Sequence, residues 1–447
     1  MNKSQILKLI ISLGIISIIS ITIYFNWFLN LNFNFLLPNE NIKCSDCNVI
    51  LISLDDLRSD HISSYGYFRN TTPNIDRLVK ESILFENAFS QASWTIPSHA
   101  SLFTSKYPIK IHMLSEDDKL NESELTISKI LKNNGYKTFG LINVFQLNST
   151  YGFNQGFDVY EELNENNTNK TLPIIFDWLE NNTNEKFFSF IHFYSIHLPY
   201  GQPPYDNLFD PTYKGFVDNI SFESLIKDKS NIYLWNYTYF DKTKNLTLKL
   251  NDRDIQHIIA HYDGGILYTD SILSKIFDKL KELELYNNTI IIIFSDHGEN
   301  LMEHNYLQHG DTLYDEAIHV PIIIYVPNST LKGIRIKSQV QLIDVVPTIL
   351  NLLDISIPRQ AEGKSLIPLI SGRQEKDFDK YVFSEDADYD ISIRTPNWKL
   401  IKNADNSMEL YDLKNDPKEL NNRINEPLNI IDELKYTLIQ WKIKENP

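Results

Sequence analysis

Two apolar runs in the sequence end in side chains that commonly bind metal ions. The run NVILISL leads directly into Asp55 and Asp56, and the run TIIIIFS leads into Asp296 and His297. Three carboxylates and one imidazole make a suitable set of ligands for a divalent cation. An acidic pair after a strand can also be a simple turn or a helix cap. Because both pairs follow apolar runs, we favour a metal site that all four side chains form.

A third stretch, TIPSHASLF, contains a hydroxyl group that could attack a bound ester. Pro97 suits the first turn of a helix, where its missing N–H would have no partner. Thr95 then lies at a helix N-terminus, where free N–H groups and the helix dipole favour an anion. Thr95 is therefore either a capping hydroxyl or a nucleophile beside a phosphate or sulfate group. A neighbouring metal ion would lower the pKa of that hydroxyl and offset negative charge in the transition state.

Five apolar runs alternate with amphipathic stretches and are expected to form buried strands. Continuous apolar strands that are separated by helices indicate an α/β fold with a mostly parallel sheet covered on both faces. In such sheets, ligands bind beyond the carboxyl ends of the strands. From about residue 380 the pattern changes to short extended runs, which predict a small antiparallel sheet. The five runs are residues 48–54, 137–144, 186–194, 289–295 and 321–327.

The N-terminal segment is the clearest topological signal. Residues 6–28 are apolar with Lys8 as their only charge, and they are long enough to cross a bilayer. Basic residues precede the segment and aromatic residues lie near its far end, so we expect an uncleaved single-pass anchor. The rest of the chain would then lie outside the cytoplasm, at the cell membrane. The predicted divisions are a transmembrane anchor (1–30), a linker (31–47), a catalytic domain (48–375) and a C-terminal subdomain (376–447).

Composition restricts the partners of the chain. The 447 residues carry a formal net charge of −16, whereas a nucleic-acid-binding protein would show a basic surface. A local metal site could still attract an anionic ester despite that overall charge. Cys44 and Cys47 are the only cysteines. They could form a local disulfide outside the cell, a redox motif or half of a metal site, and we treat them as structural or incidental.

Several long motifs cover the chain from about Asn48 to Asn422. They are LDDLRSDHISSYGYFRNTTPNIDRL, WTIPSHASLFTSKYP, SDHGENLMEHNYLQHGDTLYDEAIHVP and ELYDLKNDPKELNN. Together they resemble the sulfatase family of the alkaline phosphatase superfamily. The resemblance implies a three-layer α/β/α sandwich around a large mixed sheet, with a small C-terminal sheet subdomain. It also implies that Thr95 occupies the nucleophile position and that the metal ligands are Asp55, Asp56, Asp296 and His297.

Two residues depart from the family pattern. The family has cysteine or serine at the position of Thr95, and that residue is oxidised to formylglycine. Oxidation of a threonine would give a ketone instead of that aldehyde, which argues against a formylglycine cofactor. His99 stands where the family has arginine. A threonine nucleophile resembles instead the membrane-anchored phosphotransferases of the superfamily, which move phosphoethanolamine or phosphoglycerol onto glycans or lipid headgroups.

Further side chains could contact the anion. By resemblance, His197 and His309 fall at or near substrate-contacting positions, where they could steady the anion or protonate the leaving group. His99 and Lys106 could bind the anion or could be solvated residues. His192 shares a strand with apolar neighbours and is expected to be a core histidine.

The sequence therefore predicts a membrane-anchored enzyme that hydrolyses or transfers a sulfate ester or, more favourably on chemical grounds, a phosphate ester. One divalent ion, either zinc, manganese or calcium, would activate Thr95. The substrate would be a sulfated or phosphorylated glycan or a lipid headgroup. The alternatives are a transferase for phosphoethanolamine or phosphoglycerol and a non-catalytic binding protein on the same fold.

Overall fold

The computed structural model describes residues 42–445 apart from 164–167, 216, 218–231, 236–237, 242–245, 373–377, 379 and 388. Its centre is an eight-stranded sheet in the order β13-β2-β12-β9-β1-β5-β3-β4. Strand β12 is antiparallel to both of its neighbours, and the other pairings are parallel. The strands are β1 (Asn48–Leu54), β2 (Ile83–Phe89), β3 (Lys137–Ile142), β4 (Val159–Glu162), β5 (Phe187–Phe193), β9 (Thr289–Phe294), β12 (His319–Tyr325) and β13 (Ile334–Gln341).

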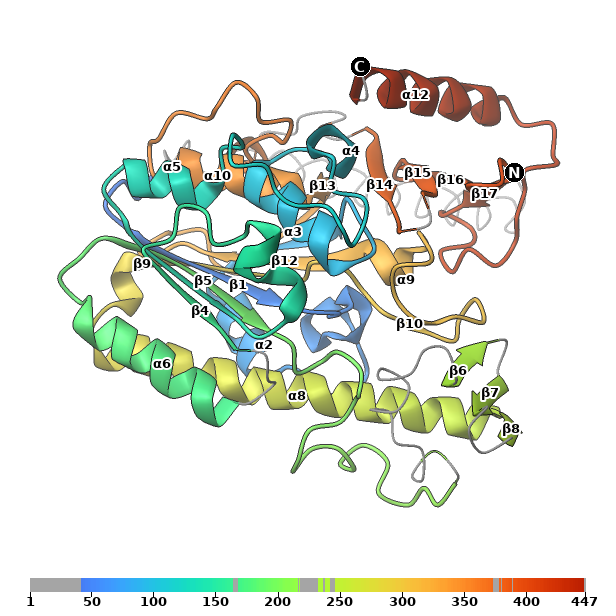
Figure 1. The fold of residues 1–447 in the computed structure, drawn as a ribbon, viewed down its shortest axis with the longest axis horizontal. Helices are drawn as coiled ribbons and strands as arrows, with labels where there is room; N and C mark the ends of the chain where they lie inside the picture. Colours follow the sequence, from blue (N-terminus) through green and yellow to red (C-terminus); the bar gives the residue numbers. More distant parts are fainter. Residues whose placement is uncertain are drawn as a thin grey trace, which may run out of the picture.

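Helices cover both faces of this sheet (Figure 1). Val49 and Leu51 of β1 belong to the hydrophobic core under α3, α5, α10 and α11. Ile50 and Ile52 point to the opposite face and join the core under α2, α6 and α8, as the two-residue period of a strand requires. The helices are α2 (Pro73–Val79), α3 (Thr95–Thr104), α5 (Ile127–Asn133), α6 (Thr168–Asn181), α8 (Asp252–Glu282), α10 (Val345–Leu352) and α11 (Ile367–Ile370). Each such fully buried aliphatic side chain contributes about 1.5–3 kcal/mol.

The 31-residue helix α8 supports the turn that follows β1. A capping box fixes its N-terminus, in which Asn251 accepts a hydrogen bond from the N–H of Asp254 and Asp254 accepts one from the N–H of Asn251. About three turns after this N-terminus, the hydroxyl of Tyr262 donates to the carbonyl of Asp56 (2.6 Å) and accepts from the N–H of Arg58 (2.9 Å). This buried tyrosine therefore fixes the backbone on both sides of the turn.

A small antiparallel sheet forms the C-terminal part of the chain. Helix α12 packs its apolar residues Leu434, Leu438 and Trp441 against this sheet. Short helices α4 and α9 lie between it and the large sheet (Figure 1). The elements are α4 (Pro108–Ile111), α9 (Asp315–Ile318), β14 (Val382–Glu385), β15 (Ile391–Arg394), β16 (Trp398–Lys402), β17 (Met408–Asp412) and α12 (Asn429–Glu445).

The predicted α/β fold, with a large mixed sheet and a small C-terminal antiparallel sheet, is confirmed. All five predicted strands are present, as β1, β3, β5, β9 and β12, and the sheet is mostly parallel and covered on both faces. Strands β2, β4 and β13 complete it. Two short sheets lie outside these layers, β10 (Asn300–Leu301) with β11 (Leu307–Gln308), and β6 (Ile232–Trp235) with β7 (Thr238–Asp241) and β8 (Leu246–Lys249).

The predicted N-terminal anchor (1–30) lies outside the described residues. Within the described part of the chain, no helix combines the length and the apolar character that a membrane span needs. Cys44 and Cys47 form a disulfide with each other. They are therefore a local structural link and not half of a metal site.

Candidate active site

The predicted metal ligands meet at the carboxyl ends of two neighbouring strands. Strands β1 and β9 pair in parallel, so Asp55 and Asp56 leave the sheet beside Asp296 and His297. Helix α3 begins at the same place, because the hydroxyl of Ser98 donates to the carbonyl of Asp296 (2.6 Å). The structure thus brings all four side chains together, and all four are fully buried.

His297 lies at the centre of this cluster. Its Nδ1 donates to the carbonyl of Gly298 (2.9 Å) and lies 3.2 Å from Oδ1 of Asp56, which turns Nε2 toward the remaining side chains. Nε2 lies 3.2 Å from Oδ2 of Asp296 and 3.5 Å from Oδ1 of Asp55. It also lies 3.4 Å from Oγ1 of Thr95. Three oxygen atoms therefore surround one ring nitrogen.

Thr95 is the first residue of α3, and Trp94 occupies the N-cap position. The Thr95 hydroxyl therefore does not act as the N-cap of the helix, which was one of the two readings of the sequence. Instead it faces His297, with 5% of the residue exposed. This is the position that a nucleophile at a helix N-terminus would take.

Six carboxylate oxygens of the cluster have no hydrogen-bond partner among the described residues. They are both side-chain oxygens of Asp55, Asp56 and Asp296. Buried polar atoms are normally paired, and a buried carboxylate without a partner is strongly unfavourable. The oxygens and the imidazole nitrogen of His297 therefore fit a divalent cation, which would satisfy them together.

The pKa values separate the ligands into two kinds. Burial and then the carboxylate of Asp296 raise the pKa of Asp55, and burial and then Glu299 raise that of Asp56. Burial also acts to raise the pKa of Asp296, but His297 holds it well below its usual range. Burial opposes the protonation of His297, yet the same carboxylate raises the pKa of His297 to about 9. Without a metal, Asp296 and His297 form an ion pair, whereas Asp55 and Asp56 resist ionisation.

A second group of metal-binding side chains shares Asp56 with the first. One ligand atom each of Asp56, His197 and His309 lies within 4.8 Å of the others. Nδ1 of His309 is 3.0 Å from Oδ1 of Asp56 and 3.4 Å from Oε2 of Glu299. The side chains of His197 and His309 are each 15% exposed, whereas the carboxylates are fully buried. These two histidines therefore form the solvent-facing side of the cluster.

Local contacts fix the orientation of His197. Its Nδ1 donates to the carbonyl of Leu198 (2.6 Å), and its Nε2 accepts from the hydroxyl of Tyr194 (3.0 Å). The imidazole also stacks on the ring of Tyr194, with 4.1 Å between centroids. Burial and then the neighbouring His309 lower the pKa of His197. His197 is therefore neutral at pH 7, with both ring nitrogens in hydrogen bonds.

The structure places two predicted substrate contacts away from the solvent-facing side of the cluster. His99 is fully buried under the cluster, where Nε2 pairs with the hydroxyl of Ser53 and Nδ1 donates to the carbonyl of Thr95, both at 2.9 Å. It supports the first turn of α3 and does not reach solvent. Lys106 follows the other end of α3 and forms an ion pair with Glu124 (2.6 Å). The ten residues of α3 separate it from Thr95 by about 15 Å.

Two residues of the cluster were not assigned to it from the sequence. Glu299 is fully buried beside His309, and its spacing of three from Asp296 is the signal that could have identified it. His192 is buried, as expected for a core histidine, but its Nε2 lies 3.3 Å from Oδ2 of Asp55. Its Nδ1 pairs with Asn143 (3.0 Å), and burial lowers the pKa of His192 to about 4. His192 therefore presents an unprotonated nitrogen to the ligand set.

Comparisons with known proteins identify similar sequences. A family model described as sulfatase matches residues 47–355, and a model described as N-sulphoglucosamine sulphohydrolase, C-terminal, matches residues 303–444. An arylsulfatase of Clostridium perfringens is 26% identical, in an alignment that covers 88% of this chain and 94% of that protein. Arylsulfatase K of Bos taurus is 29% identical, but the alignment covers 55% of this chain and 49% of the bovine protein.

Two solved structures with the same fold illustrate the likeness. One, solved with its substrate D-glucosamine-2-N,6-O-disulfate, has a TM-score of 0.74 at 21% identity and covers 90% of this chain and 98% of its own. A phosphonate monoester hydrolase of Agrobacterium radiobacter has a TM-score of 0.72 at 19% identity, with coverage of 89% and 96%. These likenesses establish the fold.

Proposed function

Because the chain belongs to the sulfatase family of ester hydrolases, we propose that it hydrolyses an anionic ester of a saccharide with Thr95 as the nucleophile. The ester that we favour is a phosphate ester. The observation that carries the proposal is the position of Oγ1 of Thr95, which lies at the N-terminus of α3 and 3.4 Å from Nε2 of His297. The disulfated glucosamine of a structural neighbour supports a saccharide as the alcohol part.

In the proposed reaction, the hydroxyl of Thr95 gives its proton to solvent, and Oγ1 attacks the phosphorus atom as the bond to the saccharide oxygen breaks. The N-terminus of α3 directs free N–H groups and a positive dipole toward the anion. A divalent cation, when bound, supplies charge neutralisation and a lower pKa for the attacking hydroxyl. The residues that would hold it are Asp55, Asp56, Asp296 and His297.

The two solvent-facing histidines take different parts. Both ring nitrogens of His197 are already in hydrogen bonds, and the carbonyl of Leu198 holds its one ring proton. The proton for the leaving saccharide oxygen is therefore assigned to His309, which lies beside the carboxylates of Asp56 and Glu299. His197 shapes the pocket for the anion together with Tyr194.

The chemistry of threonine favours phosphate over sulfate. A phosphothreonine can be opened by a second in-line attack of water at phosphorus, which releases the threonine unchanged. A formylglycine hydrate carries a second hydroxyl on the same carbon that can expel a bound sulfate. Threonine has a methyl group there and lacks that route. The proposed intermediate is therefore a phosphoryl group on Thr95.

The proposal is tested by turnover of aryl phosphate, aryl phosphonate and aryl sulfate, with zinc, manganese or calcium added in turn. We expect Thr95→Ala to lower phosphate turnover by about 10³-fold or more, and Thr95→Ser to retain part of it. Ser101→Ala removes another buried hydroxyl of α3 and serves as the matched control. A phosphoryl adduct on the peptide that contains Thr95, detected by mass spectrometry, would identify the nucleophile directly. Phosphate turnover that survives Thr95→Ala would refute the proposal.

Hydrolysis of a sulfate ester is the second candidate, because the matching family model and the curated relatives are sulfatases. It predicts aryl sulfate turnover that exceeds aryl phosphate turnover in the same assay. A third outcome, transfer of the group to an added alcohol with little hydrolysis, would identify a phosphotransferase. The ratio of alcohol product to free phosphate separates these two activities.

We also propose that residues 6–28 anchor the enzyme in the cell membrane, with the catalytic domain outside the cytoplasm. The support is their apolar length and flanking residues. After cell disruption, the full chain should remain in the membrane fraction through an alkaline wash and need detergent for release. A variant that lacks residues 1–41 should be recovered without detergent. Recovery of the full chain in the wash would contradict the anchor.

A further inference from the structure

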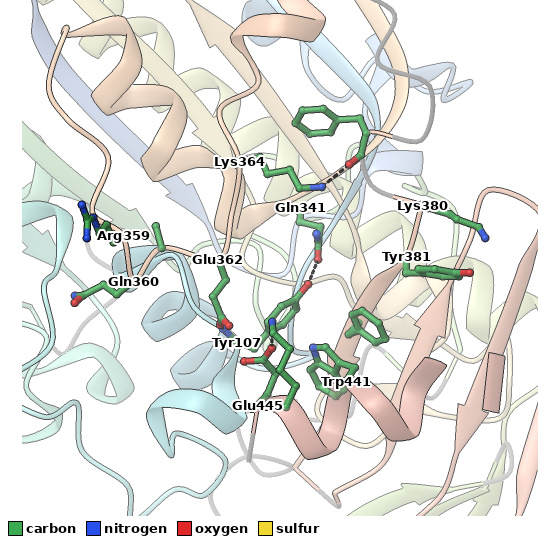
Figure 2. Close-up of a pocket in the computed structure, with 14 residues that line it drawn as sticks. Tyr107, Gln341, Arg359, Gln360, Glu362, Lys364, Lys380, Tyr381, Trp441 and Glu445 are labelled. Carbon is green, nitrogen blue, oxygen red and sulfur yellow. Dashed lines mark hydrogen bonds and ion pairs between the residues drawn. The ribbon is translucent and has the colours of Figure 1, made fainter. Parts of the chain in front are cut away.

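A cavity of about 650 Å³ lies between the segment after α3 and helix α12 (Figure 2). Its aromatic wall consists of Tyr107, Phe383 and Trp441. The ring of Trp441 stacks on Phe383 at 4.6 Å and meets Tyr107 edge-on at 5.3 Å. The ten residues of α3 separate this cavity from Thr95 by about 15 Å, so it is distinct from the candidate active site.

Cations surround the cavity although the chain as a whole is acidic. Four basic residues line it, in a chain with a net charge of −16. Arg359, Lys364 and Lys380 lie on three sides of the opening in Figure 2, and all three are exposed. The fourth is Lys444, whose side chain is 76% exposed. Lys380 also pairs with Glu433 (3.0 Å) and Lys444 with Glu445 (2.6 Å), but four basic residues against two acidic ones still leave the lining positive. The local charge therefore favours an anion, against the overall field of the protein.

Buried groups in the wall also point to a ligand. The residue Trp441 is 7% exposed, and its indole N–H has no hydrogen-bond partner in the described part of the chain. A buried donor of this kind is normally paired. The two carboxyl groups of the wall, Glu362 and Glu445, interact with each other, and burial together with that contact raises the pKa of Glu362. The raised pKa of Glu362 adds to the positive balance that four basic residues and two carboxyl groups already give the lining.

We propose that this cavity binds a segment of a polyanionic saccharide, at a distance from the catalytic centre. Aromatic faces pack against sugar rings, the indole N–H donates to a ring substituent, and the exposed lysines and arginine bind sulfate or carboxylate groups. The choice of a saccharide rests on the proposed function, whereas the anion site rests on the cavity alone.

The test is direct binding of a heparin hexasaccharide to the full chain, measured by calorimetry. Trp441→Phe removes the indole N–H and keeps an aromatic ring on Phe383, while Arg359→Gln with Lys364→Gln removes two exposed charges. Both variants should bind about three- to tenfold more weakly than the unmodified chain. The matched control, Lys414→Gln with Lys418→Gln, removes two exposed charges elsewhere and should bind normally.

Equal binding by the pocket variants and the control would overturn the proposal, and so would equal binding of a neutral hexasaccharide. The thermal unfolding midpoints of the variants must stay close to that of the unmodified chain. If Trp441→Phe unfolds, the binding of the variant Arg359→Gln with Lys364→Gln tests the proposal alone. Aryl ester turnover should be unchanged in all pocket variants. Absence of turnover in the unmodified chain, with hexasaccharide binding intact, would refute the proposed function and leave this site standing.

Discussion

Two neighbouring ligands should change the stability of the chain in opposite directions when no metal is present. Asp296 and His297 form a fully buried ion pair at 3.2 Å. Removing one partner of a buried pair costs roughly 3–5 kcal/mol, so Asp296→Asn should destabilise the protein by that amount. Asp55 is equally buried, but its pKa is raised where that of Asp296 is lowered, so Asp55 resists ionisation and does not form the charged half of a pair. Asp55→Asn should therefore stabilise the protein.

The sign for Asp55 follows from its pKa. Burial and the carboxylate of Asp296 raise that pKa above the unfolded value. When a carboxyl has a higher pKa in the folded state than in the unfolded state, the unfolded state loses the proton first as the pH rises. The free energy of unfolding therefore falls above the unfolded-state pKa. Replacing it with a neutral amide removes this loss, with a gain of about 1–3 kcal/mol at pH 8, the usual cost of an unsatisfied buried group.

Urea unfolding at pH 8 with a chelator measures both free energies. Asp278→Asn is the matched control, because its carboxylate is 76% exposed and its substitution should change stability by less than about 0.5 kcal/mol. Adding metal at 100 times its Kd should stabilise the unmodified chain by about 2.7 kcal/mol, and both ligand variants should lose this response. Equal signs for Asp55→Asn and Asp296→Asn, or an unchanged metal response in either, would refute the reasoning.

Three further predictions concern residues outside the ligand set. Burial raises the pKa of Glu385 from 4.5 to about 7, so the free energy of unfolding should fall as the pH rises through this range. Glu385→Gln should remove this fall, which amounts to at most about 3 kcal/mol and is measured by urea unfolding at several pH values. Lys399 is fully buried between Asp315 (2.7 Å) and Glu419 (2.8 Å), so Lys399→Met should lower the unfolding free energy by roughly 3–5 kcal/mol. Lys106→Gln should leave aryl ester turnover unchanged, because the side chain is paired with Glu124. A large loss of turnover would indicate that Lys106 contacts the substrate.

The sequence predicts the large sheet well because apolar runs alone define its central strands. The run 48–54 coincides with β1, and the residues after β1 and β9 meet because these strands are parallel neighbours. These residues meet because parallel strands end at the same edge of the sheet, and the alternation of strands and helices in the sequence already indicates parallel strands. Strands with mixed composition, such as β13 (IRIKSQVQ), carry weaker signals because the half-exposed edge of the sheet needs fewer apolar residues.

The roles of individual histidines could not be predicted, because they depend on side-chain direction. All ten residues of α3 are buried, so the helix has no solvent-facing side from which to place His99. It points inward because Ser53 offers a hydrogen bond at the end of β1. His192 has the sequence environment of a core residue and is buried like one, yet its place opposite Ser53 in the parallel pairing of β5 with β1 brings it to Asp55.

The charge of the cluster also constrains the order of binding. Four fully buried carboxylates lie within one group of contacts, whereas the solvent-facing side chains are two histidines, one of them neutral. Above the raised pKa values of Asp55 and Asp56, an anionic ester that approached this group alone would be repelled by the ionised carboxylates, at distances where screening by solvent is weak. His297 is already paired with Asp296, and the positive end of α3 carries only about half an elementary charge, so neither offsets the remaining carboxylates. In that pH range, if the proposed function holds, a cation binds before the ester or together with it. The carboxylates are Asp55, Asp56, Asp296 and Glu299.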